Sequence, residues 1–134
     1  MLSAMLLVIS ITALAQFALY YWRAVLAGVA AQPVSDRVFA AAGLDDGHVT
    51  ANDFATLAGL HELTPDLQAG NGGLGVVRLY YRAVDALGAL AGSRFPAVAA
   101  WSERECAVCA RYAAVQIDRR LQVNLALAAS LRNC

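Results

Sequence analysis

The chain has 134 residues, of which 60% are hydrophobic and 15% are charged. Its ten basic residues balance ten acidic ones, and every basic residue is Arg. Nucleic-acid binding depends on clustered basic side chains that neutralise phosphates, so this balance argues against a nucleic-acid partner.

The N-terminal segment is predicted to be a transmembrane helix. No side chain from Met1 to Trp22 is charged. A helix over this run is about 33 Å long at 1.5 Å per residue, enough to cross a hydrocarbon core of roughly 30 Å. Aromatic and basic residues gather where a span leaves the bilayer. The predicted membrane-interface residues are Tyr20, Tyr21, Trp22 and Arg23.

A cleavable signal peptide is the alternative for this segment, because Ala13-Leu14-Ala15 resembles a small-residue cleavage site. A signal peptide begins with positive charge, whereas no basic residue precedes Arg23. We therefore expect an uncleaved transmembrane anchor over residues 1–31 and a small helical soluble domain over residues 32–134.

Charge also predicts orientation and compartment. Basic residues favour the cytoplasmic side of a span, and Arg23 and Arg37 both follow this one. This predicts an external N-terminus and a cytoplasmic C-terminal domain. Abundant Ala and Arg without Lys is typical of a GC-rich genome, so we expect a single-pass protein of a bacterial inner (cytoplasmic) membrane.

Polar residues recur along one side of the predicted span. Thr12, Gln16 and Tyr20 are four residues apart and share a helix face. Polar side chains at membrane depth usually face protein rather than lipid. We therefore expect this stripe to bind a partner, with simple tolerance in lipid as the alternative.

The next elements are short. Pro33 disfavours helix at Gln32, so the first helix should end there. Residues 34–42 are predicted to form a helix that ends at Gly43, a plausible C′ glycine. Asp45-Asp46-Gly47 favours a turn.

Two further helix starts follow. Thr50 and Asp53 have the spacing of an N-cap with an acid three residues on. The helix that they open should end near Glu62 and bury one face, consisting of Phe54, Leu57, Ala58 and His61. Another short helix is expected to start at Pro65, before the glycines of residues 70–73.

The C-terminal half should contain the long helices. One has two apolar stripes and is therefore expected to be central: the first is Leu74, Val77, Tyr81, Val84 and Gly88, the second Tyr80, Ala83, Leu87 and Leu90. The last helix should begin at Phe95-Pro96, with a new start or kink at Ser102, where a capping box occurs. The sequence thus predicts an all-α fold: one transmembrane helix and a bundle of about four helices.

Cys106 and Cys109 form a CxxC motif, the spacing of many metal and redox sites. A structural metal site needs four ligands, and no second close pair exists in the chain. Reactive thiols usually stand at a helix N-terminus, whereas Ser102 caps this helix a turn earlier. The preferred interpretation is two small core residues.

The segment from Ala42 to Phe54 contains Asp46 and Gly47, followed by His48, and has Asp53 just before its last residue. Aligned on its glycine, this segment resembles a degenerate loop of the EF-hand or dockerin type. The resemblance implies that Asp46 and Asp53 bind calcium at positions five and twelve. Positions one and three hold Ala42 and Leu44, which cannot ligate, and a turn followed by a capped helix accounts for the same residues.

Arg78, Tyr81 and Arg82 are candidate partner-binding residues, because Arg and Tyr are enriched in protein interfaces. The alternative is a solvated helix face with local ion pairs. No arrangement of base and nucleophile is evident in the sequence, so we expect no enzymatic activity and no cofactor.

The favoured function is a non-enzymatic, single-span accessory subunit of a larger bacterial membrane complex, with integral membrane subunits and the lipid bilayer as partners. Two alternatives remain: a membrane-tethered adaptor or regulator that recruits a soluble partner, and a CxxC metal or thiol-redox module.

Overall fold

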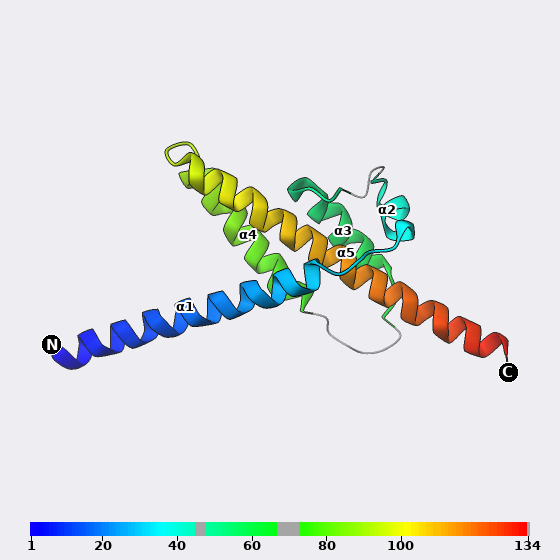
Figure 1. Ribbon diagram of the computed structural model, residues 1–134, viewed down its shortest axis with the longest axis horizontal. Coiled ribbons are helices and arrows are strands. Elements are labelled where there is room, and N and C mark those ends of the chain that lie inside the picture. Colours follow the sequence, from blue (N-terminus) through cyan, green and yellow to red (C-terminus); the bar gives the residue numbers. More distant parts are fainter. Residues whose placement is uncertain (45–47, 67–72, 134) are drawn as a thin grey trace.

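A computed structural model describes residues 1–44, 48–66 and 73–133, which contain helices and no strand. This confirms the predicted all-α class, with one long apolar helix followed by a helical bundle (Figure 1). The elements are α1 (Leu2–Ala30), α2 (Asp36–Ala42), the 3-10 helix η1 (Ala51–Asp53), α3 (Phe54–Leu63), α4 (Leu74–Ala91) and α5 (Pro96–Arg132).

Helix α1 has a bare part, residues 2–21, whose side chains are all exposed, and a packed part that begins at Trp22. Its N-terminal end projects away from the bundle (Figure 1), whereas Leu26 and Ala30 near its C-terminal end are buried. The helix stops just before Gln32-Pro33, as the proline predicts. The anchor and the domain therefore share a few buried residues.

The short helices follow their capping signals. Gly43 ends α2 with a φ of 71°, a left-handed conformation that favours glycine. Thr50 and Asp53 form the predicted capping box, with one 3-10 turn before α3. The predicted inner face of α3 is confirmed, since its four residues are all buried.

The predicted helix start at Pro65 is wrong. Residues 64–66 are not helical, and residues 67–72 lie outside the described part. The segment is instead tied to its neighbours: the Thr64 hydroxyl donates to the carbonyl of Leu60, and Asp66 pairs with Arg120 at 2.9 Å. The ion pair with Arg120 is a tertiary contact, and it overrides the local preference of proline for a first helical turn.

Helix α5 is the centre of the bundle, and it runs unbroken through Ser102. Its 37 residues make it about 55 Å long, and α1, α2, η1, α3 and α4 all pack on it. The predicted helix start at Ser102 is wrong, since the helix already begins at Pro96 and the Ser102 hydroxyl donates to the carbonyl of Ala99, 2.9 Å away, inside it.

The central position predicted for α4 is also wrong. Its first stripe packs on α5, with Leu74, Val77 and Val84 buried. In its second stripe Tyr80 is half-buried and packs against the core, whereas Ala83, Leu87 and Leu90 are exposed. A second apolar face makes a helix central only where another helix of the same chain packs on that face.

Candidate functional site

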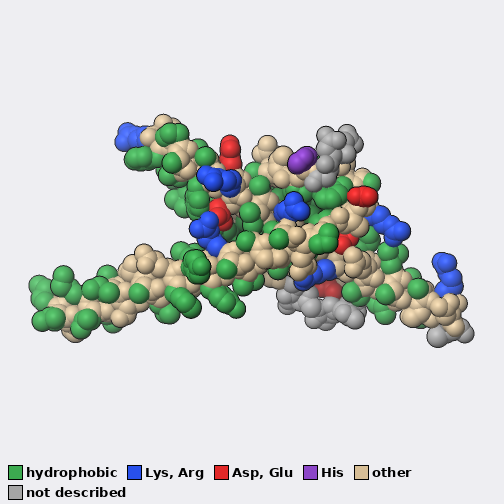
Figure 2. Space-filling model, viewed as in Figure 1, with side chains coloured by type: hydrophobic (Ala, Val, Ile, Leu, Met, Phe, Trp, Pro, Cys, Tyr) green, Lys and Arg blue, Asp and Glu red, His purple; other side chains and the backbone are tan. Residues whose placement is uncertain are grey.

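The bare part of α1 is long and apolar enough to span a membrane. Its 18-residue apolar window has a mean hydropathy of 2.1, and none of it is buried by the rest of the chain. Figure 2 shows hydrophobic side chains along this helix from its free end to the bundle. A soluble fold would leave these side chains in water.

The predicted partner stripe lies entirely on this bare part. Thr12, Gln16 and Tyr20 are all exposed, and the Thr12 hydroxyl donates to the Val8 carbonyl at 2.8 Å. That internal hydrogen bond lets a threonine sit in an apolar surrounding. Tyr20 also lines an open crevice beside α5, and the partner role of the stripe stays a prediction.

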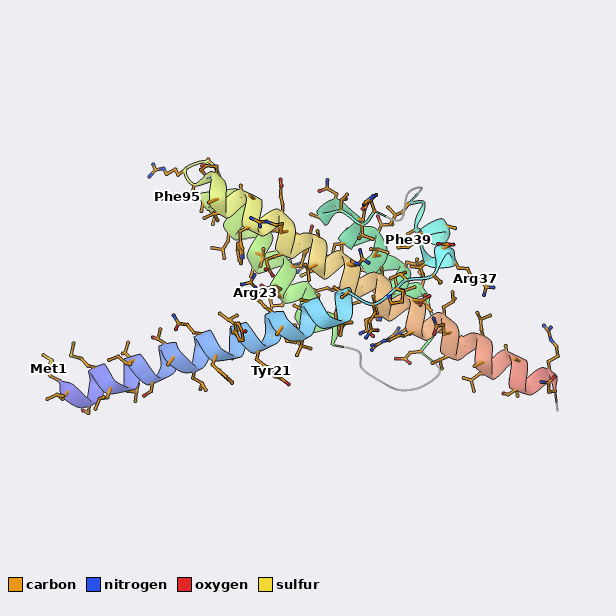
Figure 3. The ribbon with its side chains drawn as sticks, in the orientation of Figure 1. Met1, Tyr21, Arg23, Arg37, Phe39 and Phe95 are labelled. Carbon is orange, nitrogen blue, oxygen red and sulfur yellow. The ribbon has the colours of Figure 1, made fainter. Side chains whose placement is uncertain are left out.

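The predicted interface residues lie where α1 enters the bundle. Tyr21 is exposed, whereas Trp22 is half-buried and packs against the core. Arg23 lies on α1 at the junction with the bundle (Figure 3). This is the level at which a span predicted to end at Trp22 would leave the hydrocarbon.

A buried carboxylate connects three helices at this junction. Glu105 of α5 accepts two hydrogen bonds from the Arg23 guanidinium of α1, one of them at 2.9 Å from Nε. The Tyr80 hydroxyl of α4 donates to the other oxygen of Glu105, also at 2.9 Å. Burial and this hydrogen bond raise the pKa of Tyr80 above its ordinary value. The phenol therefore stays protonated and keeps donating.

A second set of polar contacts continues the junction towards the C-terminal end of α5. Arg111 donates to the carbonyl of Ala30 at 2.7 Å, which satisfies one of the free carbonyls at the end of α1. Arg119 donates to Gln32 at 2.8 Å, and the Ser35 hydroxyl donates to Asp118. The end of α1 and the following linker are thus held along about two turns of α5.

Sequence reasoning missed this junction. The signal was present, because Glu105 and Asp118 stand beside the apolar stripe of α5 rather than opposite it. Charged residues next to a buried stripe are rarely left without partners. The partners themselves, 82 and 83 residues away in the chain, are not visible in any local pattern.

An open crevice of about 350 Å³ lies in the angle between α1 and α5. It is lined by Tyr20, Arg23 and Glu105, together with Ala24, Ala27 and Val108. The small side chains of Ala24 and Ala27 on α1 leave room here.

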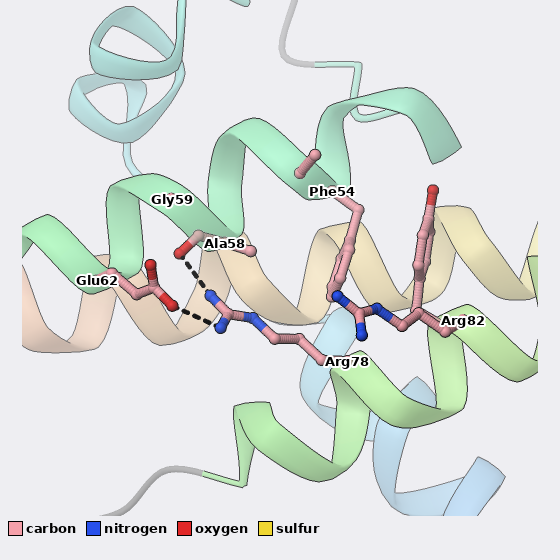
Figure 4. A pocket seen from close by; sticks show the side chains of 8 residues that line it. Phe54, Ala58, Gly59, Glu62, Arg78 and Arg82 are labelled. Carbon is pink, nitrogen blue, oxygen red and sulfur yellow. Dashed lines mark hydrogen bonds and ion pairs between the residues drawn. The ribbon is translucent and has the colours of Figure 1, made fainter.

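The predicted interface residues of α4 make contacts within the chain. Arg78 donates to Glu62 and to the carbonyl of Ala58 (Figure 4). Tyr81 stacks on Phe54, with ring centroids 4.2 Å apart, and donates to the carbonyl of Ala51. These two residues join α4 to α3 and η1.

Arg82 lines an open groove of about 330 Å³ between α3 and α4, whose walls also include Phe54, Gly59 and Glu62. Figure 4 shows Arg82 and Arg78 side by side along this groove. The groove is where a partner segment would lie if Arg78, Tyr81 and Arg82 have the predicted role.

The CxxC motif lies inside the core. Cys106 and Cys109 are free and buried on α5, and burial raises the pKa of Cys106 to about 11 and that of Cys109 to about 12. Since the thiolate is the nucleophile and the metal ligand, these surroundings oppose both chemistries. The helix begins at Pro96, so the thiols also lie far from its N-terminus.

Of the two candidate calcium residues, the structure describes only Asp53. Asp53 accepts hydrogen bonds from the backbone and hydroxyl of Thr50, at 2.8 and 2.7 Å, and so acts as part of a helix cap. Asp46 lies outside the described residues. Within the described ranges, no three His, Cys, Asp or Glu side chains gather in a way that would hold a metal ion.

Comparisons with protein-family models, with curated proteins and with solved structures found no match to this chain.

Proposed function

We propose that this protein is a single-span accessory subunit of a larger bacterial membrane complex, in which α1 is the anchor and the bundle covers a membrane-proximal face. The observation that carries the proposal is the bare apolar surface of α1, which no other part of the described chain covers. Lipid and the helices of integral subunits are the surroundings in which such a surface is stable.

The junction supports a structural role for the bundle. A tethered domain on a flexible linker would move freely above the bilayer, whereas here Arg23, Arg111 and Ser35 fix the end of the anchor to α5. A rigid connection sets the orientation of the bundle relative to the span. That suits a subunit that must fit against fixed neighbours.

Copurification tests this proposal. The affinity-tagged chain, extracted in mild detergent, should bring down integral membrane proteins in fixed ratio that persist through a high-salt wash. Gln16→Leu should keep the chain in the membrane but weaken that retention, because a hydrogen bond across helices is worth about 0.6–2 kcal/mol. The matched control Ile11→Val, also on exposed α1, should leave retention unchanged. Isolation of the chain alone would contradict the proposal.

The adaptor function is a second candidate, and the groove between α3 and α4 is the observation that favours it. A soluble partner seated there would be lost on washing, and Arg82→Ala would abolish its recovery while leaving the integral partners in place. The same experiment therefore separates the two functions.

Orientation remains a proposal that rests on Arg23 and Arg37. We expect a membrane-impermeant thiol reagent, applied to intact cells, to leave Cys134 unmodified. Modification of Cys134 from outside would place the bundle in the periplasm instead.

A further inference from the structure

The turn between α4 and α5 has the composition of a membrane segment. Residues 86–101, here called the hairpin tip, contain one charged side chain, Arg94. The hairpin tip extends beyond the bundle, and it lies on the same side of the molecule as the free end of α1 (Figure 1).

The inner surface of the hairpin tip is built from the smallest residues. Gly88 of α4 and Gly92, the residue that follows the last residue of α4, face Ser102 and Ala99 of α5. A Cβ atom added at Gly88 would clash with Oγ of Ser102, and one at Gly92 would lie 3.1 Å from Cβ of Ala99 and closer still to the carbonyl oxygen of Gly88. This close approach of two helices across a GxxxG spacing is typical of helix pairs in membranes.

Three large apolar residues of the hairpin tip point outward, whereas Val98 and Trp101 are half-buried. Leu87, Leu90 and Phe95 are 51%, 80% and 60% exposed, and Phe95 lies at the turn, away from the bundle (Figure 3). A hairpin in water places its leucines between the helices and small or polar residues outside. This hairpin has the reverse arrangement.

The junction fixes the direction in which the hairpin tip points. Arg23 of α1 pairs with Glu105, and Ala30, further along α1, contacts Arg111, further along α5. The two helices therefore run in the same sense. The stretch of α5 from Glu105 back to Pro96 therefore points in the same direction as the stretch of α1 from Arg23 back into the apolar span.

The distances place the hairpin tip at the depth of an interfacial segment. The nine residues from Glu105 back to Pro96 cover about 13 Å along α5, and less along α1 because the two helices splay apart (Figure 1). Interfacial helices are buried roughly 5–10 Å into the boundary between headgroups and acyl chains. Arg94 at the turn can bind lipid phosphates from there.

We propose that the hairpin tip is a second membrane contact, inserted into the interfacial layer of the leaflet from which α1 emerges. This inference rests on the proposed function, because the position of α1 in the bilayer defines the level of the hairpin tip. Two contacts joined by the Arg23–Glu105–Tyr80 junction would hold the bundle against the membrane in one orientation.

Depth-dependent quenching tests this inference in the purified full chain, reconstituted in vesicles of phosphatidylcholine and phosphatidylglycerol. A Cys134→Ser background leaves only the buried Cys106 and Cys109, so an environment-sensitive fluorophore can be placed on Leu90→Cys or Phe95→Cys. Val76→Cys is the matched control, since it is an exposed apolar position at the other end of α4. Leu14→Cys reports on the span.

We expect nitroxide-labelled lipids to quench the fluorophore at positions 90 and 95 at least threefold more strongly than at position 76. Quenching at position 14 without quenching at 90 and 95 overturns the hairpin inference and leaves the anchor intact. Absence of quenching at position 14 overturns the anchor itself. Blue-shifted emission at position 90 that is insensitive to nitroxide lipids and lost on diluting the protein with lipid overturns the inference in favour of contact with a second copy.

Discussion

The ion pair between Arg23 and Glu105 should respond asymmetrically to the loss of its two members. The Arg23 side chain is 50% exposed, whereas that of Glu105 is 10% exposed. Arg23→Leu leaves a carboxylate in buried surroundings with Tyr80 as its remaining donor. Glu105→Leu leaves a guanidinium that water can solvate. We therefore expect the first substitution to destabilise the fold more than the second.

The magnitudes follow from burial. Removing one partner of a buried ion pair costs about 3–5 kcal/mol, and we take about 3 kcal/mol for Arg23→Leu because Tyr80 still donates. In Glu105→Leu the unpaired Arg23 is half-exposed, so the loss of its ion pair adds little to the destabilisation, since exposed ion pairs are worth at most about 1 kcal/mol. The Tyr80 hydroxyl then loses its acceptor, which adds about 1 kcal/mol. The double substitution should lower the free energy of unfolding only as much as Glu105→Leu alone does. This corresponds to a coupling energy of about 3 kcal/mol between the two side chains.

Thermal unfolding of the full chain in detergent micelles, followed by tryptophan fluorescence, measures this cycle. In a domain of this size, 1 kcal/mol corresponds to roughly 4–8 °C in Tm. Arg23→Leu should lower the Tm by about 12–24 °C, and Glu105→Leu, at about 1–2 kcal/mol, should lower it by at most about two-thirds as much. Equal losses, or additive losses in the double variant, would refute the view that Glu105 is the buried member on which the junction depends.

Three further predictions concern the bundle. Burial and two neighbouring arginines lower the pKa of His61, so His61 binds a proton in the unfolded chain before it does in the folded chain as the pH falls below about 6.5. The Tm should therefore decline between pH 7 and pH 5.5, and His61→Leu should remove that decline. Gly88→Val should cost about 1–3 kcal/mol because its side chain meets α5, whereas Gly59→Ala, which meets nothing within 4 Å, should be neutral or stabilising in thermal unfolding. Cys106 and Cys109 should resist a thiol reagent in the native chain and react in denaturant, and rapid native labelling would contradict their burial.

The sequence predicts the local features of this fold well. The end of α1 before Pro33, the left-handed Gly43 and the Thr50–Asp53 capping box each depend on residues a few positions apart. The inner face of α3 depends on helical periodicity alone. Such features follow from short-range sterics and hydrogen bonding, and the structure confirms them.

Features that depend on distant partners could not be predicted from local patterns. The capping box at Ser102 does not open a helix, because Glu105 is held by Arg23 and Tyr80 and the helix already starts at Pro96. The second apolar stripe of α4 predicts a central helix, whereas in the structure Leu87 and Leu90 leave this stripe exposed. Its exposure is what points to the membrane.

Alkaline carbonate extraction of membranes tests whether α1 holds this protein in a lipid bilayer. The intact chain should remain in the membrane pellet. Leu14→Arg, which places a charge near the middle of the span at a cost of about 2.5–3.5 kcal/mol, should move the chain to the supernatant. Release of the intact chain by carbonate, or retention of the Leu14→Arg variant at the level of the intact chain, would contradict anchoring by α1.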